Sequence, residues 1–245
     1  MKKYYQTTWH GIKFSDFTRT NVKKIADASF YQLFYKEFFE RYTRWDELPL
    51  RWRNQKKTWA SFIQSRINNG NILSVGCGLG YTERVLQQLS SGHVYIHEVA
   101  ASAWQWITNE FPHNKKLLGS IPDCLPSETI FDLIYITAVD YALNNDDLVC
   151  LLSSLRPFLK NGKKQGECLL ISASFLEVPE TIKHKIRGVV KIVLSKIGLY
   201  EMGQFWGWQR TQNEYRLLMQ KAGYEDIKDG FIENREEKSY WISGQ

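Results

Sequence analysis

Few cysteines and no long apolar run set the first limits on what this chain can be. The 245 residues include 4 cysteines, at positions 77, 124, 150 and 168, and no two of them form a C-x-x-C pair. This wide spacing argues against a structural zinc site and against a disulfide framework. No segment reaches the roughly 20 apolar residues of a membrane-spanning helix, and the lysine-containing amino terminus lacks an apolar signal-peptide core. We therefore predict no metal site, no membrane span and a cytoplasmic location.

The usual signatures of hydrolases and of disordered proteins are also missing. The 5 histidines form no H-E-x-x-H motif and no Ser/His/Asp arrangement, and the chain has no repeat or long polar tract. With 43% hydrophobic, 14% aromatic and 24% charged residues, the chain can build the core of one α/β domain with an attached helical piece. The net charge of +6 favours acidic partners.

The most informative stretch is residues 71–83, with the sequence NILSVGCGLGYTE. Its short apolar run predicts a buried parallel strand, and a helical pattern follows the glycines. Gly76, Gly78 and Gly80 can adopt positive φ and let a ligand lie against the backbone, and Cys77 is a small side chain between them. The following helix directs its free N–H groups at the same place. This geometry predicts a nucleotide-like cofactor.

The spacing of the glycines helps to distinguish between cofactors. A dinucleotide fingerprint, G-x-G-x-x-G, requires its third glycine where this chain has Tyr81, so a pyrophosphate is the less favoured ligand. A second apolar strand is predicted at residues 93–97 and ends in Glu98. A carboxylate at that strand end can accept hydrogen bonds from both hydroxyls of a ribose. His97 should point to the opposite face of the strand and serve a structural role.

Glycines spaced x-G-x-G-x-G, followed by an acid at the end of the second strand, resemble the class I S-adenosylmethionine-dependent methyltransferases. The resemblance covers roughly residues 70–245. It implies S-adenosylmethionine as cofactor, with contacts from the glycine loop, including Cys77, and from Glu98 to the ribose. The family usually carries an acid two residues before the first glycine, where this chain has Ser74.

The same resemblance places the remaining cofactor contacts. Val99 matches the residue that packs on the adenine ring, and Ser120 with the backbone of Ile121 matches the turn that meets the adenine amine. Thr137 follows the predicted fourth strand, at residues 131–136, and lies at the carboxyl edge of the sheet, where ligands bind in open α/β folds.

Candidate catalytic residues come directly after Thr137. Methyltransferases that act on the amino groups of bases typically carry D-P-P-Y or N-P-P-Y here, and this chain has neither. Small-molecule enzymes of the family often carry a histidine nearby, but this chain has Tyr141, Ala142 and Leu143. If the reaction needs a base, Asp140 or Tyr141 is the candidate.

Residues 1–68 are predicted to form a helical amino-terminal cap, followed by a methyltransferase domain at 69–245. Two helices are expected in the cap, at 21–42 and 50–67, from the spacing of their apolar residues. The many rings of the first helix indicate either a wide core-facing stripe or the lining of a substrate pocket. Caps of this kind in the family often close over the cofactor.

The second half of the chain contains two unusual segments. Residues 178–200 predict a basic amphipathic helix inserted after strand five, which either packs its apolar stripe or docks on a membrane surface. Residues 203–211 predict a loop in which Trp206, Trp208 and Arg210 either bind a ring and an anion of the substrate or anchor the loop by burial.

The rest of the pattern alternates strands with helices. Helices are expected at 100–111, 146–159 and 212–222, and strands at 115–118, 167–174, 226–232 and 239–243. The fold class is therefore α/β, with helices on both faces of one sheet. The resemblance adds its form, a seven-stranded, mostly parallel Rossmann-like methyltransferase sheet.

These expectations converge on O-methylation of a small anionic or phosphorylated metabolite, such as a surface-carbohydrate precursor. An RNA methyltransferase is the alternative, but the chain has no separate RNA-binding module and a nucleic acid is the less favoured partner. A cofactor-binding regulatory subunit without activity is a further alternative, because Ser74 and Ala142 stand at usual motif positions.

Overall fold

A computed structural model describes residues 1–67, 69–112, 115–161, 165–177, 202–234 and 237–245, and the single positions 190, 194 and 200. The predicted inserted helix at 178–200 therefore lies almost wholly outside the described residues. None of the described helices has both the length and the apolar character that crossing a membrane requires.

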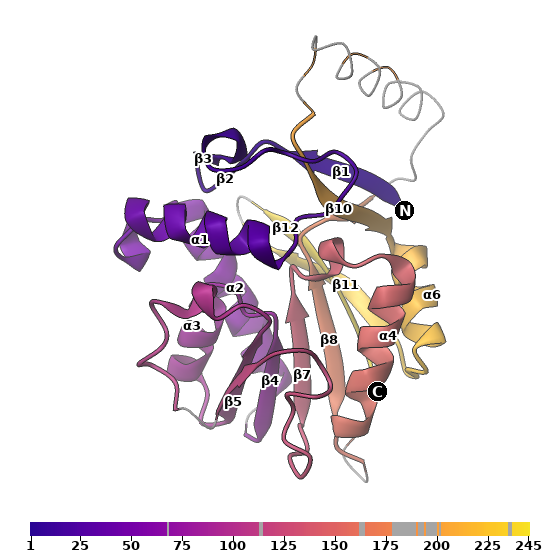
Figure 1. Cartoon of the computed structure of the whole chain (residues 1–245). Helices are drawn as coiled ribbons and strands as arrows, with labels where there is room; N and C mark the ends of the chain where they lie inside the picture. The colour runs from indigo at the N-terminus through magenta and orange to yellow at the C-terminus, as the bar shows by residue number, and fades with distance from the viewer. Residues whose placement is uncertain are drawn as a thin grey trace.

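A seven-stranded sheet forms the centre of the molecule, in the order β11-β12-β8-β7-β4-β5-β6 (Figure 1). The five strands from β8 to β6 are parallel, and the β11–β12 hairpin adds β12 antiparallel to β8. This confirms the predicted fold class and the antiparallel hairpin. The strands are β4 (Asn71–Val75), β5 (His93–Glu98), β6 (Lys116–Leu118), β7 (Leu133–Thr137), β8 (Glu167–Ser172), β11 (Lys228–Glu233) and β12 (Lys238–Gly244).

Helices cover both faces of this sheet. Figure 1 shows α2 (Leu50–Arg66) and α3 (Tyr81–Leu89) on one side, and α4 (Asn145–Leu155) and α6 (Gln212–Lys221) on the other. Successive residues of a strand point to opposite faces, so β4 sends Ile72 into the core under α2 and α3 and Leu73 into the core under α4 and α6. Both faces are buried, which explains the continuous apolar runs in the sequence.

The chain changes direction at β4. It proceeds from β4 to β5 and β6 on one side, and then returns to place β7 on the other side. In an open α/β sheet, the crevice at such a switch point, beyond the carboxyl ends of the strands, is where ligands bind. The glycine loop after β4 and η5 (Asp140–Ala142), a 3₁₀ turn shortly after β7, both lie at this edge.

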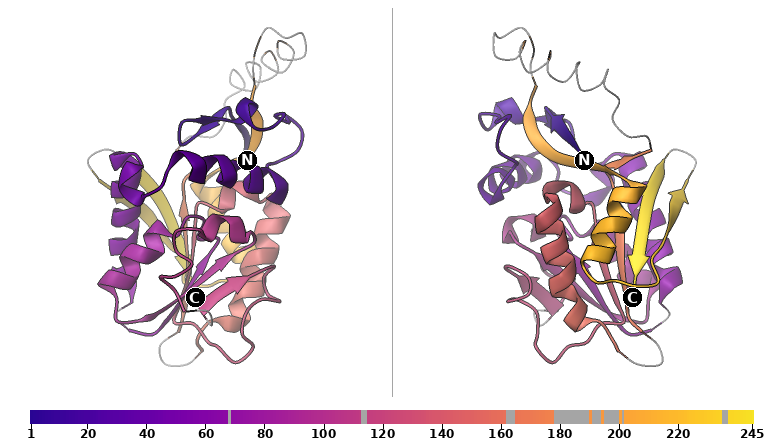
Figure 2. Two further views of the ribbon diagram at one scale, coloured as in Figure 1. Left: turned by 60° about the vertical axis from the view of Figure 1, so that its left-hand side comes forward. Right: turned by 90° about the vertical axis from the view of Figure 1, so that its right-hand side faces the viewer.

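A second group of elements lies over that edge, and we call it the roof. The roof consists of β1 (Lys2–Gln6), β2 (Thr8–Trp9), β10 (Gln204–Thr211) and α1 (Ala28–Arg41). β1 pairs antiparallel with β10, and Figure 2 shows the two side by side above the sheet. β10 also runs parallel to β9 (Phe175–Leu176), and β2 pairs with β3 (Ile12–Lys13).

One prediction about the roof was wrong. The expected loop at 203–211 is strand β10, because a partner strand near the amino terminus supplies its hydrogen bonds. The predicted cap contains its two helices, α1 and α2, and its first 13 residues add three strands. Helix α1 starts at Ala28 rather than near residue 21, since the Asp27 carboxylate caps it by accepting from the Phe30 N–H at 3.0 Å.

Two further differences concern helices. The helix expected at 100–111 is only a 3₁₀ turn, η3 (Ala101–Trp104), followed by turns, and Ala100 before it offers no side-chain cap. The helix expected at 146–159 ends at Leu155 and continues as η6 (Arg156–Phe158), which contains Pro157. The predicted helix at 50–67 agrees with α2 to within one residue. Short 3₁₀ turns also occur at η1 (Phe14–Asp16) and η2 (Trp45–Glu47).

Candidate cofactor and substrate site

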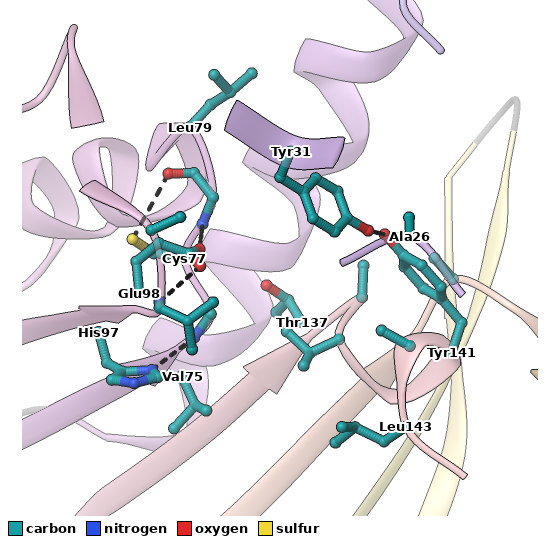
Figure 3. A pocket seen from close by; sticks show the side chains of 18 of the residues that line it. Ala26, Tyr31, Val75, Cys77, Leu79, His97, Glu98, Thr137, Tyr141 and Leu143 are labelled. Atoms are coloured by element: carbon teal, nitrogen blue, oxygen red, sulfur yellow. Dashed lines mark hydrogen bonds between the residues drawn. The ribbon is translucent and has the colours of Figure 1, made fainter. Parts of the chain in front are cut away.

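A cavity of about 730 Å³ lies between the carboxyl edge of the sheet and the roof (Figure 3). This volume is within the range of sites that take cofactors and small ligands. All nine residues predicted to contact the cofactor line the cavity. They are Gly76, Cys77, Gly78, Gly80, Glu98, Val99, Ser120, Ile121 and Thr137.

The three glycines of the loop are each required by the local geometry. Their φ angles are +68° at Gly76, +55° at Gly78 and +76° at Gly80, where side chains are strained. A Cβ on Gly76 would meet Val139 Cγ2 at 2.4 Å, and one on Gly80 would meet Ile107 Cδ1 at 2.4 Å. A Cβ on Gly78 would have only the Tyr35 hydroxyl near it, at 3.5 Å, so this backbone faces open space beneath the roof.

Glu98 ends β5 beside this loop, with its carboxylate on the pocket wall. One carboxylate oxygen accepts the Gly78 N–H at 2.9 Å and the other accepts the Val99 N–H at 2.8 Å. Burial raises the pKa of this carboxyl, and the backbone N–H groups oppose that shift. Because each carboxylate oxygen has two lone pairs, Glu98 can still accept hydrogen bonds from a ligand.

His97 holds two loops together. Its Nδ1 accepts the Gly76 N–H at 3.3 Å, so its Nε2 donates to the Gly119 carbonyl at 2.9 Å. Burial lowers the pKa of this imidazole. Both ring nitrogens are engaged, so His97 positions the glycine loop against the turn that carries Ser120, and no free nitrogen remains for proton transfer.

The structure does not place Asp140 in the pocket. Its side chain is fully buried behind η5, where one carboxylate oxygen accepts from the hydroxyls of Ser172 at 2.7 Å, Ser174 at 3.3 Å and Tyr215. Burial raises the pKa of this carboxyl, opposed by these hydrogen bonds. Asp140 is thus a positioning residue, and the prediction that it acts as a base on the substrate lacks the required geometry.

Arg210 is also directed away from the pocket. Its fully buried guanidinium donates to the carbonyls of Asp140 at 2.7 Å and Leu143 at 2.5 Å, and to the side chain of Asn145 at 2.9 Å. Asp140 begins η5, and Leu143 and Asn145 follow it. Arg210 therefore fixes η5 to β10, and it is not available to bind an anion of a substrate.

Two residues of η5, Tyr141 and Ala142, line the pocket, and Tyr141 brings the polar group. Gly207 of β10 lies directly against it, and a Cβ on Gly207 would be 2.0 Å from the Tyr141 carbonyl oxygen. The Tyr141 hydroxyl lies 3.4 Å from that of Tyr31 on α1, and Figure 3 shows the two side chains pointing toward one another. Arg210 and Gly207 therefore act together to position Tyr141.

The two tryptophans of β10 have different surroundings. Trp206 lines the pocket and is buried against Phe14 and Tyr141, with ring centroids at 5.1 Å and 5.9 Å. Trp208 is absent from the pocket lining and packs edge-on against Phe205 at 5.0 Å. Residues two apart share a face in a regular strand, so these tryptophans would lie together. A register shift of β10 opposite Tyr4 and Tyr5, where Trp206 has no partner in β1, interrupts the alternation between them.

The chain resembles known proteins in its structure and not in its sequence. No protein-family model matches the sequence, and a search of curated proteins finds no match. The solved structure of the mitomycin 7-O-methyltransferase MmcR aligns at a TM-score of 0.58 and 16% identity, over 89% of this chain and 58% of that one. Human N-acetylserotonin methyltransferase, in complex with S-adenosylmethionine, aligns at 0.54 and 16%, over 89% and 56%. A Leishmania major S-adenosylmethionine-dependent methyltransferase aligns at 0.52 and 15%, over 78% and 70%.

This chain has the class I methyltransferase fold. It spans a little more than half the length of the human enzyme and of MmcR. Among the residues that the structure describes, no group of three or more His, Cys, Asp or Glu side chains could hold a metal ion.

In this methyltransferase fold, an acid from another element, Glu83 in the first turn of α3, lies beside Ser74. The Ser74 hydroxyl donates to Glu83 Oε1 at 2.6 Å, and the Tyr135 hydroxyl donates to the same oxygen at 2.9 Å. The other oxygen, Oε2, is buried without a hydrogen-bond partner among the described residues. Burial raises the pKa of Glu83, opposed by its hydrogen bonds. A glutamate three residues after Gly80 was visible in the sequence, but only the packing places it beside Ser74.

Lys56 on α2 is a pocket residue that the sequence did not reveal. Its ammonium lies over the Trp59 ring, 3.7 Å from the centroid, and forms no ion pair with any carboxylate in the described ranges. Burial lowers its pKa to about 8, and Glu83 and Glu237 oppose that shift. An unpaired cation on the wall of a methyltransferase-type pocket is suited to an anionic group of a ligand.

Proposed function

We propose that this chain is an S-adenosylmethionine-dependent methyltransferase that acts on an oxygen atom of a small molecule. The observation that carries the proposal is the loop between β4 and α3, where Gly78 presents open backbone beside the Glu98 carboxylate at the switch point of the sheet. The structural neighbours support it, because MmcR is a 7-O-methyltransferase and the human enzyme is in complex with S-adenosylmethionine.

The residues present fit this cofactor. The Gly78 backbone leaves room for a ligand that a Cβ would fill, and the Glu98 carboxylate retains lone pairs for the ribose hydroxyls. Val99, Ser120 and Ile121 would hold the adenine, and Lys56 would bind the methionine carboxylate. When bound, S-adenosylmethionine would supply a methyl group on a sulfonium. An oxygen nucleophile attacks the methyl carbon, and the sulfur leaves as a neutral thioether.

The chain's own contribution is to align the acceptor and to keep water away. Tyr31 and Tyr35 from α1 cover the glycine loop, and η5 brings Tyr141 to the end of β7. Holding the reactants in line within a pocket of low water content supplies much of the acceleration of such a displacement.

The finer prediction of a phosphorylated sugar loses its main support, because the Arg210 guanidinium is bonded to η5 and Asn145. RNA and the non-catalytic regulatory subunit stay as alternatives that the experiment below decides between. A cytoplasmic location remains part of the proposal.

Calorimetry and a transfer assay test this proposal together. We expect the chain to bind S-adenosylmethionine and S-adenosylhomocysteine and not NAD. We also expect labelled S-adenosylmethionine to pass its label to small hydroxylated compounds and not to RNA. Tight binding of NAD alone would overturn the cofactor proposal. Label in RNA alone would favour the RNA enzyme, and cofactor binding without any transfer would favour the regulatory subunit.

Replacing Glu98 with alanine should weaken S-adenosylhomocysteine binding by about 1.5–3 kcal/mol, because charged acceptors of ribose hydrogen bonds are lost. Calorimetry measures this change. Glu128→Ala, which removes an exposed carboxylate outside the pocket, is the matched control and should leave the affinity unchanged. Equal affinity of the Glu98→Ala variant and the unaltered protein would remove Glu98 from the site.

A further inference from the structure

The charges that line the pocket are unequally distributed. Within the described residues, Lys56 is the only lysine or arginine on its wall, against three carboxylates. Lys56 belongs to the α2 side, beside Trp59 and near Glu83 of α3. Among the residues that the structure describes, the roof side, where an acceptor would enter, therefore has no cation on the pocket wall to bind a phosphate or a carboxylate. The charged lining residues are Asp27, Lys56, Glu98 and Asp147.

The roof side is instead built from aromatic rings. Trp206 of β10 stacks on Tyr141 with their planes 13° apart, and Trp9 of β2 meets Trp206 edge-on at a centroid distance of 5.4 Å. Tyr31 of α1 lies edge-on to Trp206 at 6.0 Å. All four residues line the pocket. Ring surfaces joined in this way favour a flat aromatic ligand, which gains both apolar burial and ring contacts.

Two tyrosine hydroxyls are polar groups within this aromatic wall. The Tyr31 and Tyr141 hydroxyls lie 3.4 Å apart, near the Thr137 end of β7 (Figure 3). This is at the long limit of a hydrogen bond, so both retain capacity to bond to a ligand oxygen. Burial raises the pKa of Tyr31 to about 12, so its hydroxyl stays protonated near neutral pH.

Neither Asp140 nor His97 can act as a base on an oxygen at these hydroxyls. The Asp140 carboxylate is held by Ser172, Ser174 and Tyr215 behind η5, and both nitrogens of His97 are engaged. Among the carboxylates of the described wall, Asp27 caps α1 and Asp147 lies exposed in the first turn of α4. An acceptor whose own hydroxyl ionises readily is therefore favoured. A phenol, with a pKa of about 10, does so far more readily than an aliphatic alcohol.

We infer that the methyl acceptor is an uncharged, planar aromatic compound with a phenolic hydroxyl, whose ring packs on Trp9 and Trp206 and whose oxygen bonds to Tyr31 and Tyr141. This rests on the proposed function. The acceptor oxygen forms the new carbon–oxygen bond while the carbon–sulfur bond of the cofactor breaks. The electron pair of the broken bond stays on sulfur, whose positive charge disappears, and the phenolic proton passes to water.

Binding measurements test the inference without relying on turnover. Calorimetry of the full chain with S-adenosylhomocysteine would compare 2-naphthol with 2-naphthyl phosphate and glucose 6-phosphate. We expect 2-naphthol to bind at least about tenfold more tightly than either phosphate, because ring contacts are available and a cation is not. Equal or tighter binding of either phosphate would overturn the inference.

Two neighbouring tryptophans provide a matched comparison. Trp206→Ala should weaken 2-naphthol binding about tenfold, whereas Trp208→Ala, outside the pocket on the same strand, should change it less than about twofold. Equal losses in both variants would overturn the placement of the ring. If Trp206→Ala does not fold, Trp206→Leu removes the same ring at a smaller loss of volume.

The hydroxyl contact has its own variant. Tyr141→Phe should weaken 2-naphthol binding about fivefold and leave binding of naphthalene, which has no oxygen, nearly unchanged. Equal effects on both probes would overturn the hydroxyl contact. Binding of S-adenosylhomocysteine, measured without any naphthol, separately tests the proposed function. If S-adenosylhomocysteine does not bind, the proposed cofactor is refuted. If it binds but the protein shows no preference for 2-naphthol, only the proposed acceptor class is refuted.

Discussion

Replacing Arg210 with methionine is expected to lower the free energy of unfolding by about 3–5 kcal/mol, the range for removing one partner of a buried charged network. The guanidinium is fully buried, and its loss removes the hydrogen bonds that it donates to the carbonyls of Asp140 and Leu143. It also removes the positive charge that favours the buried Asp140 carboxylate. The methionine side chain fills part of the space but donates no hydrogen bond.

Urea unfolding followed by circular dichroism would measure this change. Arg44→Met is the control, because the Arg44 side chain is 70% exposed and its ion pairs with Asp46 and Glu47 should contribute under about 1 kcal/mol. Equal stability of Arg210→Met and Arg44→Met would show that η5 does not depend on Arg210. A stable Arg210→Met variant with normal affinity for 2-naphthol would show that Arg210 is not needed to position Tyr141.

Replacing Lys56 with methionine should cost about 2–4 kcal/mol of S-adenosylhomocysteine binding, because the bound carboxylate would be left without its cation in a poorly hydrated pocket. The lowered pKa gives this contact a characteristic pH dependence. With a pKa of about 8 in the free protein, Lys56 is charged below that pH and loses its proton above it. Affinity should therefore fall as the pH rises through 8, by up to about tenfold per pH unit.

Calorimetry at a series of pH values from 6.5 to about 9.5 would record this slope. The part due to Lys56 is the difference between the unaltered protein and Lys56→Met, because titration of the ligand's own amine is common to both. Lys57→Met is the matched control, since Lys57 is exposed and does not line the pocket. A slope that persists unchanged in Lys56→Met would assign the titration to another group.

The central sheet was predictable because its information is local. Each parallel strand is a short apolar run, and the glycine loop and Glu98 follow their strands directly in the sequence. The carboxyl ends of neighbouring parallel strands meet at one edge of the sheet. Residues that follow three different strands could therefore be predicted to lie close together. The pocket lining at Gly78, Glu98 and Thr137 follows from this rule.

The remainder depended on contacts between distant segments. Arg210 looked suited to an anion because its sequence neighbours are aromatic, yet its partners are carbonyls about 70 residues earlier in the chain. Lys56 belongs to a helix whose spacing reveals an apolar face but not which cavity that face borders. Strand β10 looked like a loop because β1, which satisfies its hydrogen bonds, is at the other end of the chain.

The pairing of β1 with β10 has a consequence for how the molecule is made. Lys2 pairs with Gln209, so the ribosome must synthesise almost the whole chain before the first strand has a partner. The five parallel strands, β4 to β8, are synthesised before β10. Contacts between segments as far apart in the chain as β1 and β10 also form slowly. The glycine loop can therefore be in place before the rings above it are assembled. The strand β1 has no partner until β10 is made, so the acceptor side of the pocket forms after its cofactor side.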